Sequence, residues 1–334
     1  MILHRLQPLL AKPRISQGLE QKIYRKQAAG LRLGIDVGGT NLRIGVFLGL
    51  HLVCEYRTTP RLSEVCAQAP DSGKAKNLVV ELLEDAISNC LRDHQAVQQI
   101  GLAIPGLVDP NGHLLLQSPN LPHLQNVDFV TPLQNRFGVK VALENDANAA
   151  AYGEYLLAQK NQPSIQNLLY VGLGTGVGGG AVLNGHIFRG THGYAMEMGH
   201  LFVEPDGRLC GCGNRGCLEQ YASASGVERS YLEFSGHHRD ARHIGQLAEK
   251  GNKFARMGFN RAGHALGQAL AHVLKILDID QVVIGGGLAG SWQWIAPTFE
   301  HAMSADLIPV LRDLVQIRTS HGADCAGILG AAHL

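Results

Sequence analysis

The stretch "LRLGIDVGGTNLRIGVFLG" at residues 31–49 contains two apolar runs separated by a turn of glycines and small polar residues. A second stretch, "NLLYVGLGTGVGGGAVLNG" at residues 167–185, has the same design. Apolar runs of this length on both sides of a glycine turn predict two antiparallel strands. Because the two stretches open two halves of the chain, they predict a duplicated α/β fold with two lobes and a cleft between them.

The segments around these hairpins alternate between helical and extended patterns. Apolar periodicity predicts helices over 75–94, 146–160 and 261–278, a strand within 98–109, and a buried strand running into a glycine turn over 281–290. This alternation is typical of the α/β class. We expect a basic, solvated N-terminal extension over 1–30, a first lobe over 31–143 joined by the returning segment 320–334, and a second lobe over 144–319 that carries a metal knuckle at 200–217.

Composition narrows the classes of function. A chain of 334 residues with a net charge of +1 lacks the basic excess of a protein held to nucleic acid by phosphate contacts. It has neither a signal peptide nor an apolar run of about 18 residues, so we expect a cytoplasmic protein without a membrane partner. Its 41 glycines exceed the usual share of about 7%. We therefore expect a protein that binds small molecules through glycine turns.

Three of the seven cysteines lie within eight residues of one another, at Cys210, Cys212 and Cys217. Their C-x-C-x4-C spacing leaves glycines between the thiols, and His200 precedes them by ten residues. Three thiolates and an imidazole form the closed tetrahedral ligand set of structural Zn²⁺. The alternative is a group of buried or redox-active thiols. A closed site has no open position for water, so we expect the ion to support the fold rather than the chemistry.

Three glycine turns follow apolar runs, at 38–39, 172–180 and 285–287. Backbone N–H groups of such turns form concave anion sites, because no Cβ blocks a phosphate oxygen. One such turn alone favours an ordinary hairpin, whereas three turns that each follow an apolar run favour an anion site. The P-loop pattern and a well-placed dinucleotide fingerprint are both missing, which disfavours those nucleotide folds and a dehydrogenase.

Five motifs together resemble the ROK family of sugar kinases and repressors. They are "DVGGTNLRIGVF" (36–47), "PNLP" (119–122), "ENDANAAAYGE" (144–154), "MEMGH" (196–200) and "CGCGNRGCLEQYAS" (210–223). The resemblance implies a two-lobed, actin-like or hexokinase-type ATPase fold, ATP with Mg²⁺ as phosphoryl donor, and a hexose or N-acetylhexosamine as acceptor. Repressors of the family carry a winged-helix region before the sugar-binding lobes, and only about 30 residues precede the first strand here. We therefore expect a kinase, with a catalytically inactive sugar sensor as the alternative.

The resemblance also assigns roles to residues. It implies that Asp146 accepts the proton of the sugar 6-hydroxyl, whereas local sequence alone favours an ordinary helix N-cap. Asp36 is implied to lie near the Mg²⁺, with capping of its turn as the alternative. The remaining nucleotide contacts are implied at Gly38, Gly39, Thr40, Asn41, Gly174, Thr175, Gly176, Gly285, Gly286 and Gly287. The implied sugar ligands are Asn120, Asn145, Asp146, Glu197, His200 and Glu219.

Substrate and assembly follow from the same resemblance. The "CGCGNRGCLEQYAS" stretch is most similar to glucokinase-type members, so glucose is the first expected substrate. N-acetylglucosamine, N-acetylmannosamine, fructose and allose are the alternatives. Glu219 could instead be an ordinary solvated charge, and Asn120 an ordinary loop residue. A homodimer or homotetramer is the expected assembly.

Overall fold

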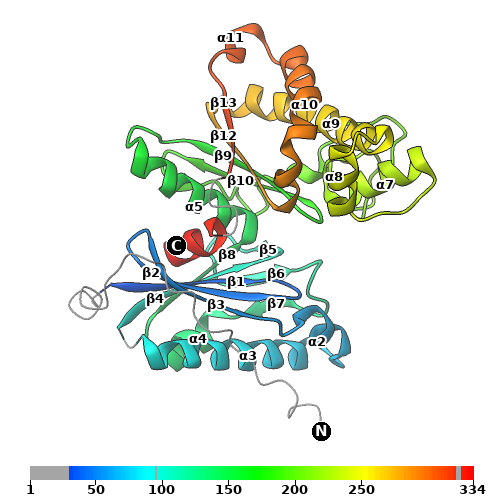
Figure 1. Cartoon of the computed structure of the whole chain (residues 1–334). Coiled ribbons are helices and arrows are strands. Elements are labelled where there is room, and N and C mark those ends of the chain that lie inside the picture. Colours follow the sequence, from blue (N-terminus) through cyan, green and yellow to red (C-terminus); the bar gives the residue numbers. More distant parts are fainter. Residues whose placement is uncertain (1–29, 95, 321–324) are drawn as a thin grey trace. The chain divides into compact units, whose positions relative to one another are not determined.

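The computed structural model describes residues 30–94, 96–320 and 325–334, so the expected extension over 1–30 lies outside these residues except for its last position. The described chain divides into two compact units. The first comprises 30–165 apart from residue 95, together with 186–195 and 325–334, and the second comprises 166–185 and 196–320. Each unit is built around one mixed sheet (Figure 1). The predicted α/β class with two lobes is confirmed.

The first unit contains a five-stranded sheet of order β3-β2-β1-β4-β8. The predicted hairpin at 31–49 is its antiparallel pair β1–β2, in which Asp36 pairs with Arg43, while β4 and β8 extend the sheet in parallel. A small antiparallel sheet of order β5-β6-β7 follows β4. The strands of this unit are β1 (Leu31–Val37), β2 (Leu42–Leu48), β3 (His51–Thr58), β4 (Val97–Ile104), β5 (Leu107–Val108), β6 (Leu114–Gln117), β7 (Gln125–Asp128), β8 (Lys140–Asn145) and the short β11 (His186–Ile187).

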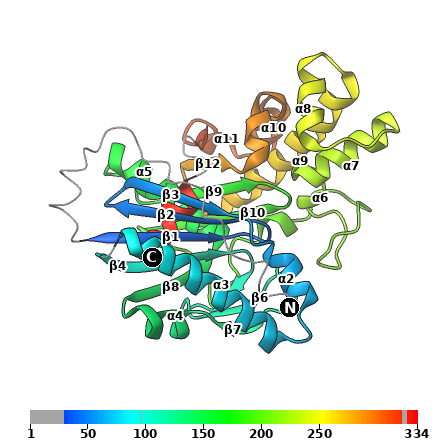
Figure 2. The same ribbon diagram turned by 60° about the horizontal axis from the view of Figure 1, so that its bottom comes forward.

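Helices cover both faces of this sheet. α2, α3 and α4 lie on one side, and α5 and α12 lie on the other (Figures 1 and 2). The helix predicted over 75–94 is α3; it begins earlier because the carboxylate of Asp71 accepts a hydrogen bond from the backbone N–H of Lys74 at 2.8 Å. The helices are α2 (Leu62–Gln68), α3 (Ser72–Asp93), α4 (Val130–Phe137), α5 (Asp146–Asn161) and α12 (Ala326–Ala332). The first unit thus includes α5, which follows residue 144, and α12 from late in the chain.

Helix α12 approaches the sheet unusually closely. Gly34 of β1 and Gly101 of β4 are neighbours in the sheet. A Cβ at Gly34 would lie 1.7 Å from the carbonyl oxygen of Ile328, and a Cβ at Gly101 would lie 1.7 Å from that of Ala331. Any side chain at either position would therefore push the helix away from the strands. These glycines are required for packing and not for a turn.

The second unit repeats the hairpin and adds parallel strands, in the order β10-β9-β12-β13. Its strands are β9 (Leu168–Leu173), β10 (Val177–Leu183), β12 (Gln281–Gly285) and β13 (Gln316–Thr319). Its helices are η2 (Met198–His200), α6 (Glu219–Ala222), α7 (Ala224–Ser235), α8 (Ala241–Glu249), α9 (Lys253–Leu277), η3 (Gly287–Ser291), α10 (Trp292–Asp306) and α11 (Pro309–Arg312).

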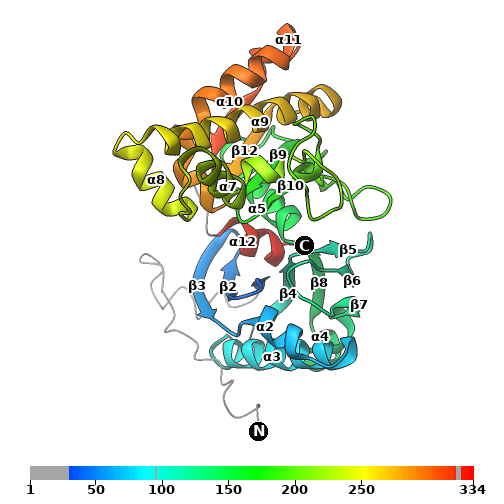
Figure 3. The same ribbon diagram turned by 90° about the vertical axis from the view of Figure 1, so that its right-hand side faces the viewer.

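Helix α9 organises the helical layer of the second unit. α7, α8 and α10 all pack against it (Figure 3). The sequence predicts its start at residue 261, but the helix begins at Lys253, because Asn252 caps it by accepting from the backbone N–H of Ala255 at 3.0 Å. Among the helices of the described residues, none is both long and apolar enough to cross a membrane.

Candidate active site and metal centre

The β1–β2 turn places a carboxylate beside exposed polar groups. The turn closes through a 2.9 Å hydrogen bond from the N–H of Gly38 to the carbonyl of Asn41. The carbonyl of Gly39 accepts from the backbone N–H of Ser63 at 2.8 Å, which fixes the turn against the start of α2. Thr40 and Asn41 remain exposed. The turn is thus held from one side and presents its small polar residues on the other.

Asp36 is the ionisable group of this turn. Burial raises its pKa to about 6, and the nearby charge of Asp146 acts in the same direction, while Arg43 partly opposes both. Arg43 does not neutralise Asp36 fully, because its Nε donates to Glu55 at 3.0 Å. In the free protein, the positive charge near Asp36 is therefore too small to balance its ionised carboxylate. A carboxylate in this state favours a bound cation, and Mg²⁺ needs few protein carboxylates because it keeps most of its waters.

This charge predicts a trade-off between stability and function. The pKa of Asp36 is about 6 in the folded chain against an ordinary 3.8, so its ionisation opposes folding increasingly as the pH rises from about 4 to about 6. This rise in the pKa of Asp36 corresponds to a free energy of about 3 kcal/mol. Solvent screening reduces that free energy to on the order of 1–2 kcal/mol. Asp36→Asn should therefore raise the Tm at pH 7.5 by about 2–5 °C, and by less at pH 4.5. Calorimetry without nucleotide or Mg²⁺ measures both values.

Asp109 provides a control, because its pKa is shifted in the opposite direction to that of Asp36. Although desolvation opposes it, the backbone N–H groups of Leu114 and His113, each 2.6 Å from the carboxylate, lower the pKa of Asp109. Asp109→Asn should consequently lower the Tm at pH 7.5. An equal or lower Tm for Asp36→Asn than for wild type at pH 7.5 would contradict the electrostatic description of Asp36.

Asp146 lies where β8 ends and α5 begins. The N-cap of α5 is Asn145 and not Asp146, because the Oδ1 of Asn145 accepts from the backbone N–H groups of Ala147 at 2.9 Å and Asn148 at 3.1 Å. The local interpretation of Asp146 as the cap is therefore wrong. Asp146 is the first helical residue, and although the residue as a whole is exposed, its carboxyl group is closely surrounded by protein atoms. Desolvation raises the pKa of its carboxyl, with the backbone N–H of Ala147 partly opposing this shift.

A buried carboxylate that the sequence analysis did not identify supports this helix start. Glu144 is 2% exposed. Its oxygens accept from the backbone N–H of Asn145 at 3.0 Å, the side-chain amide of Asn148 at 3.1 Å and the Nε of Arg189 at 2.6 Å. Arg189 belongs to the segment 186–195 of the same unit. Glu144 directly precedes the Asn-Asp pair in the sequence, and an acidic residue at the end of an apolar strand was the available signal.

Asn120 lies near the first glycine turn. Its carbonyl oxygen would be 3.4 Å from a Cβ on Gly39, so its loop and the β1–β2 turn are neighbours within the first unit. The loop is fixed by Ser118, whose Oγ donates to the carbonyl of Pro105 at 2.5 Å and accepts from the N–H of Leu121 at 3.2 Å. The side chain of Asn120 is exposed.

The second glycine turn, Gly174 to Gly176, is joined to the residue that follows the cysteine cluster. Glu219 Oε2 accepts from the backbone N–H of Val177 at 3.1 Å. A Cβ at Gly176 would lie 2.3 Å from this same oxygen, so the glycine makes room for the carboxylate. Glu219 is therefore anchored at the turn, which contradicts the alternative of an ordinary solvated charge.

Among the described glycines of the second unit, Gly174, Gly211, Gly287 and Gly290 have space for a side chain and no positive φ, and two of these lie in the glycine turns. At Gly174 and at Gly287, a Cβ would meet nothing within 4 Å, and neither has the positive φ that favours glycine. The N–H of Gly174 already donates to the carbonyl of Gly176 at 2.9 Å and its carbonyl accepts from the N–H of Ala224 at 2.8 Å, so this glycine offers open space but no free backbone donor. Gly287 is exposed. Gly286, by contrast, has φ +81° and its Cβ would lie 2.3 Å from the carbonyl oxygen of Leu173, so it is required by the fold.

The Cys₃His cluster is assembled in the second unit. The ligand atoms of His200, Cys210, Cys212 and Cys217 all lie within 4.8 Å of one another. Zn–S bonds of about 2.3 Å and Zn–N bonds of about 2.0 Å at tetrahedral angles put two sulfurs about 3.8 Å apart and sulfur about 3.5 Å from nitrogen. The Sγ atoms of Cys212 and Cys217 are 3.7 Å apart, and the Sγ of Cys210 is 3.6 Å from Nδ1 of His200. The donor set and its spacing fit a structural Zn²⁺.

The two ring nitrogens of His200 face different partners. Nδ1 faces the cysteines, and Nε2 lies 3.8 Å from a carboxylate oxygen of Glu197. A metal-bound histidine normally presents its other nitrogen to an acceptor, which fixes the ring. The short helix η2 ends at His200 and has Glu197 as its N-cap, so Glu197 and the metal ligand His200 belong to one local element.

The structure therefore brings the predicted residues into two groups, each within one unit. The first unit holds Asp36, the first glycine turn, Asn120, Asn145 and Asp146, and the second holds the other two glycine turns, Glu197, Glu219 and the metal ligands. Glycine hairpins at matching positions of two mixed sheets, together with a Cys₃His centre, define a class of two-lobed α/β proteins. The chain matches the family model for the ROK family over residues 32–334, and it belongs to that family.

Known proteins similar to the chain include both enzymes and regulators. It is 32% identical to the glucokinase of Thermotoga maritima over 317 residues, which cover 90% of this chain and 96% of that protein. It is 27% identical to the xylose repressor of Bacillus subtilis over 318 residues, which cover 93% of this chain and 78% of the repressor.

Solved structures of ROK kinases also superpose on the chain. The ROK hexokinase of Thermus thermophilus superposes with a TM-score of 0.73 at 31% identity, covering 90% of this chain and 96% of that one. The ROK glucokinase of Streptomyces griseus, solved in complex with glucose and AMPPNP, gives a TM-score of 0.72 at 27% identity, with 91% and 98% covered. The hexokinase-type fold is thereby confirmed.

Proposed function

We propose that the chain is an ATP-dependent sugar kinase that phosphorylates the 6-hydroxyl of a hexose, with glucose as the first substrate. The observation that carries the proposal is Asp146, a carboxylate with a raised pKa at a helix start that Asn145 already caps. Because capping does not explain its presence, it is available to a substrate. The similarity to a glucokinase along 90% of the chain supports glucose.

Asp146 serves as the proton acceptor for the attacking hydroxyl. Its raised pKa makes it a better base than an ordinary carboxylate. Its place in the first turn of α5 acts in the opposite direction, because a helix N-terminus favours the ionised form that a base requires. Phosphoryl transfer depends mainly on positioning and on charge neutralisation, so one well-placed carboxylate is sufficient. Glu144 and Arg189 hold the backbone from which Asp146 projects.

The nucleotide contacts are proposed at the three glycine turns. Gly174 and Gly287 leave space that a side chain would fill, and Thr40 and Asn41 offer exposed side chains. Asp36 would hold the Mg²⁺ that accompanies ATP, either directly or through water. Bound there, the ion neutralises phosphate charge.

Sugar contacts are proposed within each unit. Asn145 uses its Oδ1 for the helix cap and one amide N–H for the carbonyl of Gly106 at 2.9 Å, which leaves one N–H for a hydroxyl. Asn120 supplies a second amide. Glu197, His200 and Glu219 supply acceptors and an imidazole whose positions depend on the metal centre. Zn²⁺ would thus shape the sugar site without entering the reaction.

A sugar-sensing regulatory protein is the second candidate. The observation that favours it is the similarity to xylose repressors along most of the chain. A sensor would bind sugar without consuming ATP, and would need neither a base at Asp146 nor open glycine turns. These two features favour the kinase.

A sugar panel separates the candidates. With Mg-ATP, glucose should release ADP at the highest kcat/KM, ahead of N-acetylglucosamine, N-acetylmannosamine, fructose and allose, as measured by a coupled ADP assay. The matched control is 6-deoxyglucose, which lacks the accepting hydroxyl and should release none. Glucose binding by calorimetry without ADP release from any sugar would exclude the kinase and support the sensor. A higher kcat/KM for another sugar would reassign the substrate.

A further inference from the structure

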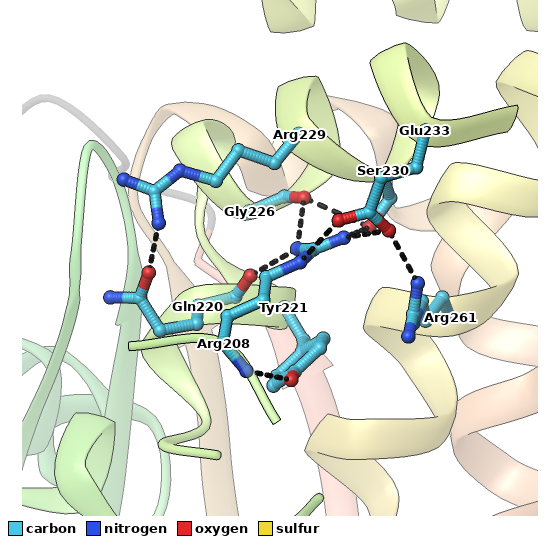
Figure 4. Close-up of polar contacts among 8 residues, drawn as sticks. All are labelled: Arg208, Gln220, Tyr221, Gly226, Arg229, Ser230, Glu233 and Arg261. Carbon is cyan, nitrogen blue, oxygen red and sulfur yellow. Dashed lines mark hydrogen bonds and ion pairs between the residues drawn. The ribbon is translucent and has the colours of Figure 1, made fainter. Parts of the chain in front are cut away.

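Arg208 occupies an unusual position two residues before the first cysteine ligand. Its side chain is only 13% exposed, although arginine is normally a surface residue. Figure 4 shows it at the centre of a polar cluster formed by the metal-ligand loop, α6 and α7. Neither the proposed chemistry nor zinc coordination uses this side chain.

The main chain of Arg208 is part of the metal-ligand loop. Its carbonyl accepts from the N–H of Gly216 at 2.9 Å, and the N–H of Cys210 donates to the carbonyl of Asn214 at 2.8 Å. Leu209 and Arg215 form an antiparallel bridge between these contacts. The segment 208–216, which carries Cys210 and Cys212, is therefore a closed hairpin loop with Arg208 at its base, and Cys217 follows it directly.

The guanidinium of Arg208 binds the helices that follow the loop. It donates to the carbonyls of Gln220 and, at 3.1 Å, of Gly226, and its Nη2 donates to Ser230 Oγ at 2.8 Å. It also forms a two-point ion pair with Glu233, at 2.9 and 2.8 Å. A planar fork with five donors can satisfy several acceptors at once, which a lysine cannot do.

Tyr221 of α6 also contacts Arg208. Its hydroxyl accepts from the backbone N–H of Arg208 at 2.8 Å, and the guanidinium lies 4.7 Å from the centre of its ring. Arg261 of α9 reaches the same ring and also binds Glu233 at 2.8 Å. Loop, α6, α7 and α9 are thus joined at one residue.

The contacts of Arg208 lead along α6 to Glu219. The carbonyl of Gln220 and the ring of Tyr221, which directly follow Glu219, are both held by Arg208. Glu219 in turn binds the N–H of Val177 at the second glycine turn. A continuous path of contacts therefore runs from the metal-ligand loop through Arg208 and α6 to the carboxylate and the turn.

We propose that Arg208 is a positioning residue that couples zinc occupancy to the placement of Glu219 and of the turn at Val177. This role rests on the proposed function, because it matters for catalysis only if Glu219 contacts sugar. Zinc orders the loop, Arg208 transmits that order to α6, and α6 fixes Glu219. The neighbouring Arg229 binds Gln220, and Arg261 binds Glu233 and the ring of Tyr221, but both arginines lie outside the metal-ligand loop (Figure 4).

Kinetics provide the first test, with Arg208→Met as the variant and Arg215→Met as the matched control. Arg215 lies in the same loop but is exposed and makes one long hydrogen bond, 3.3 Å to the carbonyl of Gly207. Arg208→Met should keep about one zinc per chain, raise the sugar KM by about 10–100-fold and leave the ATP KM within about threefold. Arg208→Lys should fall between Arg208→Met and wild type, and Arg215→Met should match wild type.

KM distinguishes positioning from folding, because it does not depend on how much enzyme is folded. A lower Tm with an unchanged sugar KM for both Arg208 variants would show a merely structural role and overturn the proposal. Loss of zinc from both variants in zinc-saturated buffer would also overturn it, because Arg208 would then be needed to form the metal site itself.

Hydrogen exchange provides a second test that does not require kinase activity. In wild type, removing zinc with a chelator should accelerate exchange of the Val177 amide by about tenfold or more. In zinc-loaded Arg208→Met, or in Arg208→Lys if the first variant does not fold, exchange should already be faster and zinc removal should add less. Wild-type protection that persists in the zinc-loaded variants would overturn the coupling even if no sugar is phosphorylated. Confirmed coupling without ADP release would retain the proposal and exclude only the kinase.

Discussion

Asp146→Asn should lower kcat by about 10²–10⁴-fold while leaving the affinity for sugar within a few-fold of wild type. The substitution removes the proton acceptor but keeps the size of the side chain and one oxygen that can accept from the N–H of Ala147, as Asp146 Oδ1 does at 2.9 Å. The helix start should survive, because Asn145 and not Asp146 caps α5. Steady-state kinetics with saturating Mg-ATP, together with calorimetric sugar titration, measure the two effects separately.

Asp240 offers the matched control. It is also exposed and stands at a helix N-terminus, where its Oδ1 accepts from the backbone N–H of His243 at 2.8 Å. Asp240→Asn should keep kcat near the wild-type value, because α8 carries no residue of the proposed site. Turnover of Asp146→Asn within a few-fold of wild type would remove Asp146 from the role of base.

Cys212→Ser should remove the metal and, with it, most of the affinity for sugar. The backbone N–H of Asn214 holds the pKa of the Cys212 thiol below its ordinary value, which favours the thiolate that zinc binds. A serine hydroxyl is a much weaker ligand of nearly the same size. Without the ion, the segment from Glu197 to Glu219 loses the centre that orders both carboxylates. Elemental analysis, sugar titration and nucleotide titration should show loss of zinc, at least tenfold weaker sugar binding and largely retained ATP binding.

A cysteine of the other unit controls for the general effect of removing a thiol. Cys325→Ser changes a half-buried residue of the first unit and should keep zinc and sugar binding. Fewer than about half a zinc per purified wild-type chain would argue against the closed four-ligand site. A zinc-free Cys212→Ser protein with normal sugar affinity would separate the metal from recognition.

Local patterns in the sequence were sufficient for the features that depend on neighbouring residues. Glycine turns between apolar runs predicted both hairpins, because strand pairing across a short turn is decided within about twenty residues. The C-x-C-x4-C spacing predicted for the same reason that the three thiols lie together. The ten residues between His200 and Cys210 are also few enough for one loop to bring the ligands together.

The supporting contacts could not be predicted, because their partners are distant in sequence. Glu144 and Arg189 are 45 residues apart, and Val177 and Glu219 are 42 residues apart. No periodicity links such pairs before the fold is known. The interpretation of Asp146 as the cap of α5 was wrong for a different reason. Asparagine and aspartate are both good caps, and only the backbone conformation distinguishes Asn145 from Asp146.

The close packing of α12 on Gly34 and Gly101 also limits when the first unit can finish folding during synthesis. Strands β1 and β4 leave the ribosome early, but the helix that covers them belongs to residues 326–332 and follows the whole second unit in the chain. Domains normally fold in the order of their synthesis. Here the first unit has an uncovered strip of backbone, centred on Gly34 and Gly101, until the second unit has been synthesised. During that interval the growing chain offers chaperones a sheet surface that the finished protein never exposes.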